Sequence, residues 1–244
     1  MRLTLCAALG VGGATIAGAL LGFAFRRVSL SLRAVTMGAA AGVMFAAAAV
    51  GLLLPVFECR LAYLWLPCGA VCGGLCLCGC ERLLRRWECG RPGETDEARR
   101  RLLLFVLAIA LHNLPEGLAA GVGFGTDRQV LALSVALGIA LQNLPEGMVV
   151  VAPLLAAGFS PAKTLLIACG TGVAEIVGTL LGYWTVSLSG AILPFALSFA
   201  GGCMLFVIVD DMLPMAREDG RGRRAGFAFL GGFCGMLIVC DLLS

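Results

Sequence analysis

Long apolar runs separated by short polar links make up most of this 244-residue chain. A helix that crosses a bilayer needs about 20 consecutive, mostly apolar residues. By that measure the pattern predicts eight transmembrane helices, which we place at about 3–25, 34–57, 61–84, 102–124, 130–157, 161–188, 192–213 and 225–243. The polar stretch 85–101 is predicted to be a cytosolic loop, and 1–244 to be one all-α integral membrane domain.

The composition excludes an ordinary soluble domain. The chain is 60% hydrophobic and 14% charged, and its mean hydropathy is +0.97. Its 34 glycines suit the close helix packing found in lipid. The run 3–25 is longer than the apolar part of a signal peptide, so we interpret it as the first transmembrane helix. We expect the lipid bilayer as a partner and no nucleic acid.

The positions of the basic residues predict the orientation of the chain. Fifteen of the 18 Lys and Arg residues lie in or beside the links between predicted helices 1 and 2, 3 and 4, 5 and 6, and 7 and 8, which all face the same side of the membrane. The other three are Arg2, Arg60 and Arg128. Because Lys and Arg favour the cytosolic side of a membrane, both termini are predicted to lie outside the cytosol. An even number of helices is required for that alternation. The sequence does not decide between a plasma membrane and an organelle membrane.

Two near-identical motifs, HNLPEG at 112–117 and QNLPEG at 142–147, begin 30 positions apart inside apolar runs. Each copy places a metal-capable side chain four residues before a glutamate, which is about one helical turn. A carboxylate at membrane depth is costly unless it is paired or ligated. The motifs therefore predict a divalent-cation site near the middle of the membrane. Its core candidates are His112, Glu116, Gln142 and Glu146.

The prolines of the two motifs add a structural expectation. Pro115 and Pro145 lack an N–H group, and their rings crowd the carbonyl four residues earlier, so we expect helix hydrogen bonds to open there. In the predicted topology the two motif-bearing helices run in opposite directions. The motifs then form an inverted repeat, which is common in carriers that bind their substrate between two halves.

Further polar side chains extend the candidate site. Asn113 and Asn143 lie one residue beyond the first ligands and suit a neighbouring second position, with Glu116 and Glu146 as bridges. Glu175, a lone carboxylate in the sixth predicted helix, either completes that position or faces a polar seam. A purely structural hydrogen-bonded pair of His112 and Glu116 is the alternative to a metal site.

Other features leave two interpretations open. Met44 offers a thioether ligand or simply fills space in the core. Asp210 and Asp211, near the end of the seventh helix, form either an exit site for a cation or a pair of interfacial acids. The third helix carries a line of thiols that suits either a soft-metal relay or, more simply, helix packing. These thiols belong to Cys68, Cys72, Cys76 and Cys80.

The paired Pro-Glu-Gly motifs and the sequence VDDMLP at 209–214 resemble the ZIP (Zrt-, Irt-like) family of divalent-metal transporters, most closely its GufA-like branch. The resemblance implies a binuclear site. One ion would bind His112, Glu116, Gln142 and Glu146, with Met44 as an additional ligand. The other would bind Asn113, Asn143 and Glu175 and share Glu116 and Glu146. Gln142 departs from the histidine of many relatives, which weakens the expectation of tight zinc selectivity.

The resemblance also implies a 3+2+3 inverted-repeat bundle, in which helices 1, 4, 5 and 6 move against helices 2, 3, 7 and 8. We therefore expect alternating-access transport of Zn²⁺, or of Fe²⁺, Mn²⁺ or Cd²⁺, towards the cytosol, with no cofactor. A metal-gated channel and a non-transporting metal sensor are the alternatives. An intramembrane metalloprotease is disfavoured, because the chain has one histidine and no HExxH motif. Small residues on helices 3 and 8 suggest a homodimer.

Overall fold

The computed structural model describes residues 1–24, 30–89, 113–125, 129–156, 159–188, 190–217 and 222–243. Within these ranges the regular elements are all helical, and seven helices are long and apolar enough to cross a membrane. The prediction of a helical membrane protein is confirmed. Of the predicted fourth span, only the helical segment 113–124 lies in the described residues. The count of eight spans therefore stays a prediction.

Five of the spans are single helices. They are α1 (Arg2–Ala24), α3 (Ala62–Cys89), α5 (Gln129–Ala156), α6 (Pro161–Leu188) and α9 (Gly222–Leu243). The second span is built from α2 (Leu30–Ala46), η1 (Ala47–Leu53) and η2 (Leu54–Glu58). The span predicted as the seventh follows η3 (Gly190–Ile192). It consists of α7 (Leu193–Val207), η4 (Ile208–Met212) and α8 (Leu213–Arg217).

The end of α3 corrects one predicted boundary. The expected loop 85–101 begins too early, because α3 continues through the first arginines to Cys89. At 28 residues α3 is about 42 Å long, whereas the hydrocarbon core of a bilayer is about 30 Å thick. The apolar pattern marks where the membrane ends, but the helix extends beyond it. Residues 90–101 lie outside the described part of the chain.

The second and seventh spans are both distorted just before a proline. In the second span the π-helical turn η1 ends two residues before Pro55, and in the seventh span the π-helical turn η4 ends two residues before Pro214. A proline ring crowds the carbonyl of the fourth residue before it, here Gly51 and Asp210, and removes one helical hydrogen bond, which favours a local distortion of the helix. Such wide turns are frequent at functional sites.

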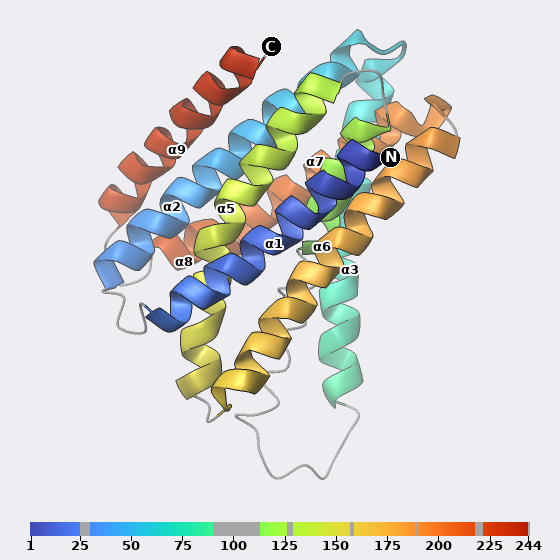
Figure 1. The fold of residues 1–244 in the computed structure, drawn as a ribbon. Coiled ribbons are helices and arrows are strands. Elements are labelled where there is room, and N and C mark those ends of the chain that lie inside the picture. The colour runs from blue at the N-terminus through green and yellow to red at the C-terminus, as the bar shows by residue number, and fades with distance from the viewer. Residues whose placement is uncertain are drawn as a thin grey trace.

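The hydrogen bond that Pro145 cannot donate does not interrupt the helix, because α5 is helical from Gln129 to Ala156. Figure 1 shows that α5 changes direction along its length, which is how many helices accommodate an internal proline. At Pro115 the chain is helical as well, although the carbonyl that this proline crowds, that of Leu111, lies outside the described residues.

The helices pack in two sets of neighbours. α1 lies between α5 and α6 and contacts both (Figure 1), and segment 113–124 packs on α6. In the other set, α2 packs along α9 and α3 packs along α7. Glycines make the close contacts in both sets, because their missing side chains let two backbones approach.

The glycine contacts of α1 recur in α6. A Cβ on Gly18 of α1 would overlap the carbonyl oxygen of Leu144 in α5, and a Cβ on Gly178 of α6 would overlap that of Leu114. The two glycines are 160 positions apart in the sequence, and the two leucines are 30 positions apart. The same offsets relate Gly22, which faces Met148, to Gly182, which faces Leu118. α1 on α5 therefore packs in the same way as α6 on segment 113–124.

The second set of helices repeats in the same manner. Gly42 of α2 faces the carbonyl of Phe229 in α9, and Gly202 of α7 faces that of Ala70 in α3. The offsets are 160 and 159 positions. The two π-helical turns, η1 and η4, also overlap under the offset of 160. In this repeat α2 therefore occupies the place that corresponds to α7, and α9 occupies the place that corresponds to α3.

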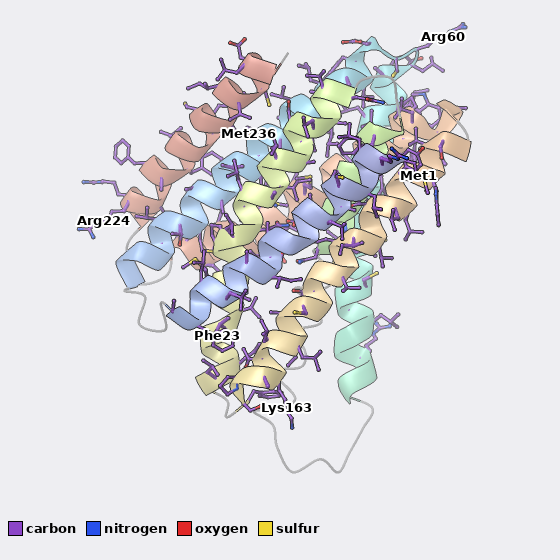
Figure 2. The ribbon with its side chains drawn as sticks, in the orientation of Figure 1. Met1, Phe23, Arg60, Lys163, Arg224 and Met236 are labelled. Carbon is purple, nitrogen blue, oxygen red and sulfur yellow. The ribbon has the colours of Figure 1, made fainter. Side chains whose placement is uncertain are left out.

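The termini and three labelled basic residues show which parts of the chain lie at each end of the bundle. The two termini lie towards one end (Figure 1). Figure 2 shows Arg60 near that end, and Lys163 and Arg224 towards the other. This distribution agrees with the alternation of basic residues along the sequence.

Candidate metal-binding site

The polar residues of the two motifs meet where segment 113–124, α1, α5 and α6 pack together. The last glycine of each motif makes this possible. A Cβ on Gly117 would lie 2.9 Å from the backbone nitrogen of Thr179 in α6, and a Cβ on Gly147 would lie 2.9 Å from that of Ala19 in α1. Both distances are shorter than real Cβ contacts, so each motif requires glycine here in order to bring in its neighbouring helix.

Glu175 is the centre of one hydrogen-bond network. Its Oε1 atom accepts a hydrogen bond of 2.6 Å from Thr15 Oγ1 and another from Asn113 Nδ2. Its Oε2 atom accepts a bond of 2.7 Å from Asn143 Nδ2, which also donates to the Val11 carbonyl at 3.2 Å. Glu175 has no exposed surface. The structure thus brings together three predicted residues from three different helices.

Glu116 is the centre of a second network. Its Oε1 atom accepts a hydrogen bond of 2.8 Å from Gln142 Nε2, and both side chains are 1% exposed. Glu146 is half-buried and lies close enough for its charge to act on both Glu116 and Glu175. The predicted acids therefore share one region of the protein, although they come from three helices.

Several oxygen atoms at this place are buried without a hydrogen-bond partner in the described structure. They are Asn113 Oδ1, Glu116 Oε2, Gln142 Oε1 and Asn143 Oδ1. A buried acceptor without a donor typically costs about 1–3 kcal/mol. All four atoms can only accept, and carbonyl and carboxylate oxygens are common ligands of divalent cations. A cation between the two motifs would satisfy them.

Three predicted site residues stand apart from these networks, and a fourth falls outside the described part of the chain. His112 lies outside the described residues. Met44 is fully buried in the apolar core that also contains Ala120. Asp210 is exposed and Asp211 half-buried on η4, which packs against α2, α7 and α8. In the described part of the chain, no three His, Cys, Asp or Glu side chains form a metal-ligand group by themselves.

The structure adds residues that the sequence analysis missed. Thr15 and Val11 of α1 contact the Glu175 network. In the repeat of 160 positions seen in the glycine contacts, Thr15 corresponds to Glu175, and Met44 corresponds to Met204. Met204 is fully buried on α7. The recurrence of Gly-x-Met at 42–44 and 202–204 is a sequence signal that could have revealed this repeat.

A cavity of about 200 Å³ opens near the end of the second span. It lies between η1 and η2 on one side and α5 on the other, with the start of α7 along its wall, and Glu58 and Cys59 border it. The sequence analysis did not single out this place.

The four thiols predicted to line the third helix differ in exposure, and Cys80 is half-buried. Cys68, Cys72 and Cys76 are exposed, while Gly69 and Gly73 pack against α7.

Comparison with known proteins identifies the family. A family model described as "ZIP Zinc transporter" matches residues 88–240, which include both motifs, Glu175 and η4. The chain belongs to this family. Zinc transporter ZIPB of Bordetella bronchiseptica is 31% identical over 249 residues, which cover 95% of this chain and 78% of that protein. The family resemblance predicted from the motifs is thereby confirmed.

Two other relatives support the same membership, including its GufA-like character. Zinc transporter GufA of Myxococcus xanthus is 43% identical over 153 residues, or 63% of this chain and 60% of that protein. Human zinc transporter ZIP11 is 42% identical over 158 residues, or 62% of this chain and 46% of its own length. The matched part thus spans about half the length of these two relatives. Family members are named as transporters, which supports the expectation that this chain is not an enzyme.

Proposed function

We propose that this protein transports a divalent metal ion, zinc above all, across the membrane towards the cytosol. The observation that carries the proposal is the group of buried acceptor oxygens on the two motifs, on Asn113, Glu116, Gln142 and Asn143, which find no donor among the described residues. They lie beside three carboxylates from different helices. A doubly charged cation satisfies both the unpaired oxygens and the negative charge in a place that water cannot solvate.

We assign the ligands to two neighbouring positions. One ion binds His112, Glu116, Gln142 and Glu146, with Met44 as an additional ligand. The second binds Asn113, Asn143 and Glu175, and Glu116 and Glu146 bridge the two. The hydrogen bonds support this division, because Gln142 pairs with Glu116 while Asn113 and Asn143 pair with Glu175.

Transport proceeds by alternating access between two groups of helices in a 3+2+3 inverted repeat. The first, fourth, fifth and sixth helices move against the second, third, seventh and eighth. The recurring glycine contacts support this arrangement, since they relate α1 to α6, α2 to α7 and α3 to α9. The cavity beside Glu58 lies between the two groups and suits an outer entrance. Asp210 and Asp211 then lie along the exit, and both termini lie outside the cytosol.

Zinc is the first choice of ion because His112 nitrogen and carboxylate oxygens are common zinc ligands. Gln142 supplies an amide oxygen where a second imidazole would favour zinc more strongly. The site therefore also suits Fe²⁺, Mn²⁺ and Cd²⁺.

A homodimer is the assembly we propose. Of the described spans, α3 and α9 are the least buried, because only 17% of the residues in the apolar stretch of each helix are buried inside the protein. Several of their glycines, Gly79, Gly226, Gly231 and Gly235, have open space around them. Two copies of the chain would pack these faces together. Mass measurement of the protein in detergent tests this.

The function is tested by removing both bridging acids. We expect Glu116→Ala combined with Glu146→Ala to abolish zinc binding to the purified protein in detergent and zinc uptake into proteoliposomes. Asp241→Ala, which removes an exposed acid on α9, is the control and should bind and transport as the wild type does. Unchanged zinc binding in the double variant would refute the proposal.

The kinetics of uptake distinguish the proposed carrier from the alternatives. A carrier gives flux that saturates with zinc concentration at modest turnover. A measurable zinc current would indicate a channel, and binding without flux would indicate a sensor.

A further inference from the structure

A hydroxyl group on α1 contacts the carboxylate of Glu175. Thr15 is 1% exposed, and its Oγ1 atom donates a hydrogen bond of 2.6 Å to Glu175 Oε1. None of the predicted ligands lies on α1, so this bond adds a further helix to the site. We propose that Thr15 is a positioning residue that determines which oxygen of Glu175 binds the transported ion. The inference rests on the transport function proposed above.

The packing of α1 fixes the place of Thr15. A Cβ on Gly147 would overlap the carbonyl oxygen of Thr15, just as a Cβ on Gly117 would overlap that of Glu175. Thr15 is therefore the counterpart of Glu175 in the repeat. One half of the repeat supplies a carboxylate at this point, and the other supplies a hydroxyl that donates to it. Gly12 and Gly172, which are also 160 positions apart, let α1 and α6 touch three residues before this pair.

The hydrogen bonds leave the two oxygens of Glu175 in different states. Among the described residues, Oε1 accepts from both Thr15 and Asn113, whereas Oε2 accepts only from Asn143. A carboxylate oxygen has two lone pairs, so Oε1 is fully used and Oε2 keeps one free. The ion binds through Oε2, while Thr15 holds Oε1 in place. Groups that hold a ligating carboxylate in this way typically change metal affinity by about 10- to 100-fold when they are removed.

Thr15→Val tests the inference because it removes the hydroxyl and keeps the shape of the side chain. The matched control is Thr179→Val. Thr179 is also fully buried, but its hydroxyl donates at 2.9 Å to the backbone carbonyl of Glu175 and not to its carboxylate. Zinc is titrated calorimetrically into the full chain in detergent, and uptake is measured in proteoliposomes.

We expect Thr15→Val to weaken zinc binding and raise the KM for uptake by roughly tenfold or more, with a smaller change in the maximal rate. Thr15→Ser, which keeps a hydroxyl, should restore both values, and Thr179→Val should match the wild type. In a Glu175→Gln background Thr15→Val should have little further effect, because the two residues act as one unit. If Thr15→Val is not monodisperse, Thr15→Ala is titrated instead, with Thr179→Ala as its control.

Equal zinc affinity and KM in the Val, Ser and wild-type proteins would overturn the inference. So would a loss of maximal rate at unchanged KM that persists in the Glu175→Gln background, since this would mean a purely structural role. Either result leaves the transport function intact as long as the Glu116 and Glu146 double variant loses zinc binding. If that double variant still binds zinc, the proposed function itself fails.

Discussion

The contact between Gly147 and α1 offers a test of the packing that builds the site. A Cβ on Gly147 would lie 2.9 Å from the backbone nitrogen of Ala19 and 3.1 Å from the carbonyl carbon of Thr15. Ordinary Cβ contacts begin at 3.4 Å. Gly147→Ala therefore forces α1 and α5 apart by at least about 0.5 Å, because the atoms that it meets belong to a helical backbone and cannot rotate away.

The energetic cost follows from that displacement. Overpacking of a closely packed contact costs about 1–3 kcal/mol. The same shift would lengthen the hydrogen bond from Asn143 on α5 to the Val11 carbonyl on α1 from 3.2 Å to about 3.7 Å, beyond the usual range for an N–H···O bond. We therefore expect Gly147→Ala both to lower the stability of the protein and to weaken its binding of zinc.

The assay is thermal unfolding in detergent, followed by intrinsic fluorescence, together with zinc titration of the same sample. Gly13→Ala is the control, since a Cβ on Gly13 of α1 would meet nothing within 4 Å. It should be neutral or slightly stabilising, because alanine is favoured over glycine in a helix by about 0.5–1 kcal/mol. An unchanged unfolding temperature and zinc affinity in Gly147→Ala would refute the close packing of α1 on α5.

Two further predictions concern the ion. Gln142→His should tighten zinc binding at the first position, because imidazole is the better zinc ligand; an unchanged affinity in the titration would mean that Gln142 does not contact the ion. Zinc binding should weaken as the pH falls, because histidine and carboxylate ligands must lose their protons to bind a metal; titrations across a pH series test this, and equal affinity in acid would argue against carboxylate ligation.

The sequence by itself determined the family and placed the seven spans that the structure describes. The bilayer requires about 20 apolar residues for each crossing helix, so α6, from Pro161 to Leu188, lies where the pattern placed it. It also predicted a candidate metal site, because the two motifs carry metal-capable side chains at helical spacing. It could not place the end of α3, which extends past the apolar run, or decide whether Pro145 interrupts α5. That helix stays continuous because proline removes only one local hydrogen bond, and the turns on either side still form theirs.

Only the tertiary structure decided which groups surround Glu175. Asn113 and Asn143 were expected nearby, but Thr15 lies 160 positions away in an apolar run and carries no recognisable motif. Its contact depends on close helix crossings, at Gly12, Gly147 and Gly172, that bring α1 to α5 and α6. A single sequence does not encode such a crossing locally, because it results from the fit of two helix surfaces. Residues four apart on one helix share a face by geometry alone, whereas residues on separate helices meet only once the bundle has packed.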